Sequence, residues 1–102
     1  MSEEVPEWQI MWGAKVKTPV DMADDVLKDA ISYVTTEMQK CENFESDGEQ
    51  MVQKIKEHMD NEWKPNWHVV IGRNFGSVVT HETRSFLYFY LKDKAVMMFK
   101  AG

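Results

Sequence analysis

Apolar residues in the first half of the chain recur with the spacing of a helix. From Met22 to Cys41 they fall three or four positions apart, which places them along one face of an α-helix. This stripe predicts a helix over about 22–42. Asp21 precedes it and is a residue type that favours the N-cap position.

A second helical stripe follows after a short polar segment. It runs from Met51 to Trp63 and ends before Pro65, which cannot continue a helix. Ser46 has a glutamate three positions on, the spacing of a capping box. We therefore predict a second helix over about 47–63, capped by Ser46.

Both ends of the chain instead show the two-residue alternation and the β-branched and aromatic content of strands. The fold class predicted is α+β: an N-terminal strand region, two helices on one face, then a four-strand antiparallel sheet region. The predicted strands are 8–12, 14–17, 67–71, 75–81, 85–91 and 94–101.

The segment 85–91 is apolar on both sides. Alternation puts Phe86, Tyr88 and Tyr90 on one face of this strand, and Leu87, Phe89 and Leu91 on the other. The helices cover only one face of the sheet. A second apolar face on a small domain is usually hidden in a dimer or a binding site.

Composition narrows the class of protein. A chain of 102 residues is long enough for one core. Its net charge of −5 argues against nucleic acid as a partner, because phosphates require a basic face. No apolar run has the length of a membrane span, so no membrane insertion is expected. The single cysteine, Cys41, is interpreted as a small core residue.

Three groups of residues could form a metal, catalytic or phosphate-binding site, but for each group a chance or structural explanation is the better interpretation. His58 and Glu62 are one helical turn apart, yet two such residues are common by chance. Ser77 and His81 on one strand would lie about 13 Å apart, too far for a nucleophile and its base. The glycine-containing segment 72–76 is not followed by the lysine or by the helix of a phosphate-binding loop, so its glycines indicate a turn between strands. We expect no enzyme activity, no metal and no cofactor.

The C-terminal half carries a specific resemblance. The run WHVVIGRNFGS at 67–77, VTHET at 79–83, FLYFYL at 86–91 and the ending FKAG strongly resemble the small dynein light chains of the light chain eight type. The resemblance covers about residues 13–102. It divides the chain into an N-terminal extension, 1–12, and a dynein light chain domain, 13–102.

The resemblance implies a strand-swapped homodimer. Each subunit would lend the strand around Phe75–Val79 to the sheet of its partner. The residues that the resemblance places at the dimer interface are His68, Phe75, Ser77 and Val79.

The resemblance also implies a non-enzymatic hub that binds short linear motifs by adding a strand to its sheet. Implied partners are the dynein intermediate chain and other linear-motif proteins, in the cytoplasm and on the microtubule cytoskeleton. The alternative is a divergent paralogue that serves non-motor partners. The implied peptide-binding residues are Lys17, Thr18, Arg73, Asn74, Phe75, Gly76, Ser77, Val78, Val79, Thr80, His81, Phe86, Tyr88, Tyr90, Ala95 and Met97.

Two regions depart from the family pattern. The segment Ser46-Asp47-Gly48-Glu49 lacks the basic member of an acid–base pair that packs on the glutamine of the favoured Thr-Gln-Thr type of motif. We therefore expect weaker binding of that motif. Trp8 and Trp12 lie in the extension, where they are available to fold over the body of the domain or to contact something further.

Overall fold

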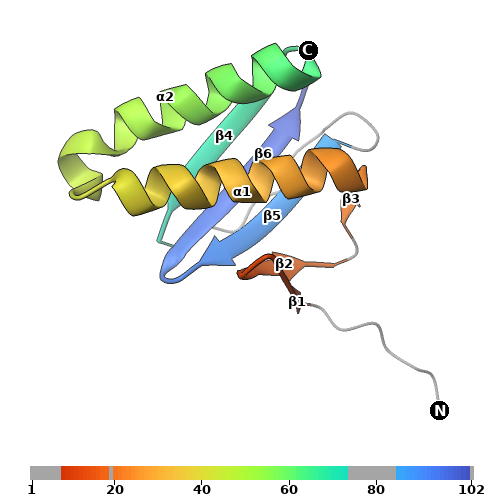
Figure 1. Ribbon diagram of the computed structural model, residues 1–102, viewed down its shortest axis with the longest axis horizontal. Helices are drawn as coiled ribbons and strands as arrows, with labels where there is room; N and C mark the ends of the chain where they lie inside the picture. Colours follow the sequence, from red (N-terminus) through yellow and green to blue (C-terminus); the bar gives the residue numbers. More distant parts are fainter. Residues whose placement is uncertain (1–7, 19, 74–84, 102) are drawn as a thin grey trace.

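The computed structural model describes residues 8–18, 20–73 and 85–101. The chain forms one antiparallel sheet with both helices packed on the same face, and the N-terminal hairpin lies at one side of that sheet (Figure 1). The predicted strand 75–81 lies outside the described residues. The elements in chain order are β1 (Trp8–Met11), β2 (Ala14–Lys17), β3 (Asp21–Met22), α1 (Asp24–Lys40), α2 (Phe44–Trp63), β4 (Trp67–Gly72), β5 (Ser85–Leu91) and β6 (Lys94–Lys100).

The two predicted N-terminal strands are confirmed, except that Trp12 lies in the turn between them, and they pair as a hairpin. β1 pairs with β2 from Trp8 opposite Lys17 to Met11 opposite Ala14. The two turn residues, Trp12 and Gly13, both have positive φ, at 49° and 84°. Such a two-residue turn matches the right-handed twist of paired strands. Residues 8–11 are therefore part of the sheet.

The first helix begins later than predicted. Asp21 is not its N-cap: Asp21 and Met22 form β3, which pairs with Phe86 and Ser85 of β5. The helix α1 starts at Asp24 after Ala23, which makes no side-chain cap. Pairing with a sheet edge has overridden the local capping preference of an aspartate.

The second helix begins earlier than predicted. Its N-cap is Asn43, not Ser46, and residues 44–46, which precede the predicted helix, belong to its first turn. The side-chain oxygen of Asn43 accepts hydrogen bonds from the backbone N–H groups of Glu45, at 3.0 Å, and Ser46, at 3.3 Å. The hydroxyl of Ser46 instead donates to the backbone oxygen of Asn43 at 3.4 Å.

Replacing Asn43 with alanine should lower the free energy of unfolding by about 1 kcal/mol, because two N–H groups lose their acceptor. Ser46→Ala is the control and should stay within about 0.5 kcal/mol of the wild type. Urea unfolding of both variants, followed by circular dichroism, measures the difference. A larger loss for the serine variant would restore Ser46 as the cap.

The sheet order is β1-β2-β5-β6-β4, and β3 pairs with β5 beyond the end of β2. β5 and β6 form a hairpin in full register, from Phe86 opposite Phe99 to Leu91 opposite Lys94. β4 continues the sheet on the far side of β6, from Trp67 opposite Lys100 to Gly72 opposite Ala95.

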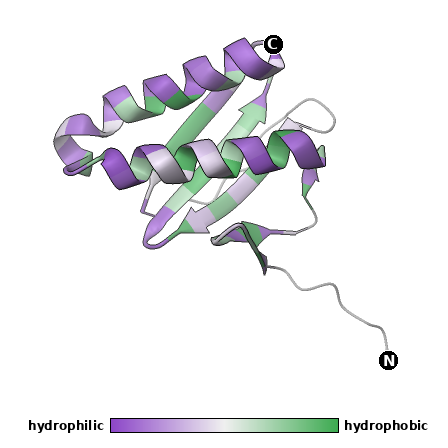
Figure 2. Cartoon of the chain, viewed as in Figure 1, coloured by the Kyte–Doolittle hydropathy of each residue, from purple (hydrophilic) through white to green (hydrophobic). Residues whose placement is uncertain are grey.

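The core fills the space between the helices and one face of the sheet. In Figure 2 the strands behind the helices are largely green and the helices largely purple, as expected for a sheet covered on this side. Leu87 and Phe89 point into this core and are buried, which confirms their predicted face. The other fully buried members are Ala14, Val16, Ala30, Ile31, Val34, Ile55, Met59, Val96 and Met98.

Candidate binding face

The sheet face opposite the helices carries three rows of side chains. Residues opposite each other in paired strands share a face, so the register defines the rows. One row holds Phe86, Phe99 and His68. The next holds Tyr88, Met97 and Val70, and the third holds Tyr90, Ala95 and Gly72.

Five predicted binding residues are brought together here. They are Phe86, Tyr88, Tyr90, Ala95 and Met97. The three aromatic side chains are half-buried, whereas Ala95 and Met97 are buried at 0% and 4% exposure. The small residue and the thioether thus lie at the bottom of the face, with aromatic rings beside them.

The two tyrosines form one unit. Their rings stack with centroids 6.0 Å apart and planes at 23°. Burial, together with a hydrogen bond and charge interaction with Tyr90, raises the pKa of the Tyr88 phenol above its usual value. Tyr88 therefore stays neutral well above physiological pH and contributes an uncharged aromatic ring to this face.

The remaining predicted binding residues fall in three places. Lys17 lies on the same face and is half-buried. Its neighbour Val16 pairs with the core residue Phe89, so Lys17 points to the side opposite the core, as does its partner in β1, Trp8. Thr18 follows β2 and is half-buried, and Arg73 is exposed just after β4. Asn74, Phe75, Gly76, Ser77, Val78, Val79, Thr80 and His81 lie outside the described residues.

His68, predicted at a dimer interface, is exposed in the single chain. Its ring stacks on Phe99 at 5.1 Å, and its Nε2 lies 3.2 Å from the backbone oxygen of Ala101. Its role in a dimer stays a prediction.

Trp8 also belongs to this face, a position that its sequence context did not predict. Its ring meets Tyr88 edge to face at 5.9 Å and Tyr90 at 5.4 Å. The available signal was the alternation of residues 8–12, which predicted a strand but could not say which strand it joins.

His58, which was one of the two possible metal ligands in the sequence, instead takes part in contacts between the two helices. His58 Nε2 lies 2.7 Å from Asp29 Oδ2, and the same oxygen accepts a hydrogen bond from the Trp63 indole at 2.8 Å. The His58 ring stacks on Tyr33 at 3.8 Å. These contacts join the two helices. Among the described residues no group of three or more His, Cys, Asp or Glu could hold a metal ion. No helix in the same part of the chain is long and apolar enough to cross a membrane.

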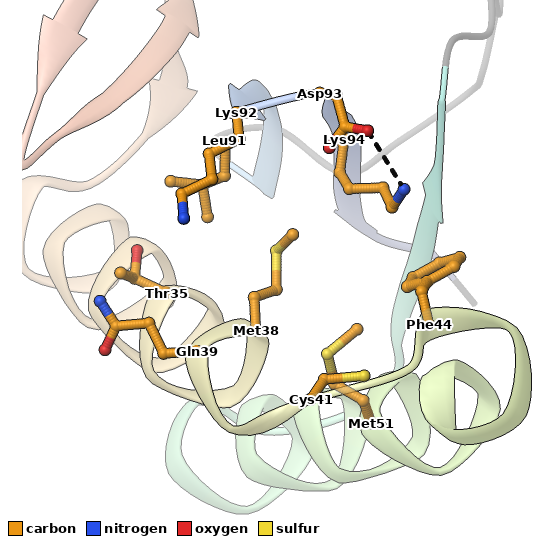
Figure 3. A pocket seen from close by; sticks show the side chains of 10 residues that line it. All are labelled: Thr35, Met38, Gln39, Cys41, Phe44, Met51, Leu91, Lys92, Asp93 and Lys94. Carbon is orange, nitrogen blue, oxygen red and sulfur yellow. Dashed lines mark ion pairs between the residues drawn. The ribbon is translucent and has the colours of Figure 1, made fainter.

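A separate cavity of about 220 Å³ opens where the helices meet the β5–β6 turn (Figure 3). The side chains of Met38, Cys41 and Met51 gather on its helical side, and Lys92 of the turn and Lys94 at the start of β6 lie opposite. Cys41 is half-buried and packs against the core, in line with its interpretation as a small core residue.

The architecture is that of a dynein light chain-like domain. It is similar to the dynein light chain-like domain of the Fasciola hepatica calcium binding protein FhCaBP2. A mercury derivative of that domain superposes with a TM-score of 0.74 and 12% identity, covering 91% of this chain and 96% of that one. A native crystal of the same domain gives a TM-score of 0.64 and 14% identity, covering 79% of this chain and 84% of that one.

The family model of dynein light chain type 1 matches residues 14–101. The chain therefore belongs to the dynein light chain family, a family that is generally non-enzymatic. The match begins at the start of β2, so β1 and Trp8 lie outside it.

Proposed function

We propose that this chain is a dimeric peptide-binding hub. It binds short linear motifs of partner proteins by strand addition and brings two partner chains together. In this role it serves the dynein intermediate chain and other motif-bearing proteins, in the cytoplasm and on the microtubule cytoskeleton. Two sites in one dimer raise the effective concentration of the second contact, so each site is useful even when it binds weakly.

The observation that carries this proposal is the aromatic face. Phe86, Tyr88, Tyr90, Ala95 and Met97 are residues that the resemblance assigns to a peptide-binding groove, and the register aligns them over two neighbouring strands. The helices lie on the other side of the sheet (Figure 1). An extended peptide beside this face would meet apolar side chains at alternate positions, and contacts with alternate side chains are how strand addition gains specificity.

The homodimer is proposed from the resemblance and from the edge of the sheet. Within 8–18, 20–73 and 85–101, β4 pairs only with β6. A strand donated by the partner, from residues 75–79, would add to a sheet edge of this kind. Sedimentation of the full chain tests this, because a monomer at all accessible concentrations would remove the dimer.

Peptide binding is tested with an array of short peptides built around Thr-Gln-Thr, with every residue type placed at each position. Binding of the tightest peptide is then measured by fluorescence anisotropy for the wild type and for Tyr88→Ala. We expect the variant to bind about tenfold more weakly, because a large aromatic contact is lost. Tyr33→Ala, which removes a half-buried tyrosine from the helical side, is the matched control. Equal loss in both variants, or an array on which nothing binds, would overturn the proposed site.

A divergent paralogue with non-motor partners is the second candidate. The first turn of α2 contains Glu45 and Asp47 and no basic residue, so the usual glutamine contact is altered. Pull-down from native extract separates the two candidates: recovery of dynein heavy and intermediate chains supports the motor role.

A further inference from the structure

Trp8 is held in place over the aromatic face. β1 is paired with β2 along its whole length, and the indole contacts the rings of both Tyr88 and Tyr90. It is half-buried, whereas Ile10 and Trp12 of the same hairpin are 70% and 49% exposed. The hairpin therefore presents one ordered ring beside the proposed groove floor.

Two ammonium groups lie close to the same ring. The Nζ atoms of Lys17 and Lys15 are 5.3 Å and 5.5 Å from the centroid of Trp8. Lys17 lies directly opposite Trp8 in the hairpin, and Lys15 is its diagonal neighbour on the same face. Each cation is attracted to the electron-rich ring face, which holds the two positive charges together.

This pair of cations is a local exception to the charge of the chain, whose net charge is −5. On the face opposite the helices, the rows formed by β1, β2, β5, β6 and β4 contain no acidic residue. On β3, Asp21 lies opposite Phe86 and so belongs to the same face. Lys15 is exposed, so a carboxylate brought to its ammonium group would meet an opposite charge, with the second cation, Lys17, beside it, and the methylene groups of the acidic side chain would lie against the indole.

We propose that Trp8, Lys15 and Lys17 form a subsite for an acidic side chain of the bound peptide. The inference rests on the proposed peptide-binding function and adds a specificity to it. Trp8 acts as the wall and the positioning residue of the subsite, and the ammonium group of Lys15 contacts the carboxylate, with that of Lys17 beside it. The subsite extends the groove beyond the part of the chain that the family model matches, which begins at residue 14.

The test uses the tightest peptide of the array, with Asp, Asn or Lys placed in turn at each position flanking its core. At one flanking position, Asp should bind the wild type about fivefold more tightly than Asn, as expected for a partly exposed ion pair. Lys should bind more weakly still. The advantage of Asp over Asn should shrink in high sodium chloride, because salt screens exposed charges.

Variants then assign the effect. Lys15→Gln should remove most of the advantage of Asp over Asn. Trp8→Ala should also remove that advantage. Ile10→Ala, an exposed residue on the same strand and face, should keep it. Circular dichroism of each variant confirms that the fold is retained.

Three results would overturn the proposal. The first is equal binding of Asp and Asn peptides at every flanking position, which removes the acidic subsite while peptide binding itself stands. The second is tighter binding of all peptides to Trp8→Ala, which makes the indole a cover over the groove. The third is an array on which no peptide binds the wild type, which overturns the proposed function as well.

Discussion

Replacing Phe89 with alanine is expected to lower the free energy of unfolding by about 3–5 kcal/mol. Phe89 is fully buried at the centre of the sheet, between Val16 of β2 and Val96 of β6. Its ring points toward the helices, so its removal leaves a cavity in the core between the sheet and the helices. Domains of this size are stable by only about 5–15 kcal/mol, so the variant loses a large share of its stability.

Urea unfolding followed by tryptophan fluorescence measures this loss. The matched control is Phe86→Ala, on the same strand but on the opposite, half-buried face. It should cost less than half as much. Where the Phe89→Ala protein does not fold at all, Phe89→Leu should still fold with a loss of about 1 kcal/mol. Equal losses at Phe86 and Phe89 would contradict the assignment of the core face.

Replacing Asp60 with asparagine is expected to cost about 1–2 kcal/mol at neutral pH. Asp60 joins the end of α2 to the start of β4. Its Oδ1 accepts a hydrogen bond from the Trp67 backbone N–H at 2.8 Å, and its Oδ2 pairs with Lys56 Nζ at 2.6 Å. Asparagine keeps an acceptor for the first contact but loses the charge for the second.

The loss should depend on pH. Burial alone raises the pKa of Asp60, but the hydrogen bonds from Lys56 and the Trp67 backbone, with the positive charge of Lys56, bring that pKa below its usual value. A carboxyl group with a lowered pKa stabilises the folded state when it is ionised. This stabilisation is present above the unfolded pKa of about 3.9 and is lost as pH falls through the lower, folded value.

Unfolding of the wild type and of Asp60→Asn should therefore be compared at about pH 7 and at about pH 3. The difference in free energy should be largest at neutral pH and shrink in acid. Glu62→Gln, an exposed position on the same helix, is the control and should show little effect at either pH. A difference that stays constant with pH would show that the charge of Asp60 does not carry the effect.

The sequence by itself determined the element types and the faces of the strands. A spacing of three or four residues between apolar positions predicted both helices. Because side chains along a strand point alternately to its two faces, Leu87 and Phe89 could be assigned to one face of 85–91 and Tyr88 and Tyr90 to the other. These properties depend on side-chain direction along a single element, so a local pattern is enough to predict them. The motif at 67–77 likewise pointed to the dynein light chain family before the fold was known.

The tertiary structure alone decided which elements meet. Asp21 is a good capping residue by its chemistry, but it lies in β3 because β5 offers a paired edge. Asn43 displaced Ser46 as the cap of α2 because its side chain reaches two free N–H groups. Trp8 contacts Tyr88 and Tyr90 because of the register in which β1 pairs with β2 and β2 pairs with β5. Contacts between residues far apart in the chain depend on strand order and register, and no local pattern encodes these, because each is set by the packing of the whole sheet.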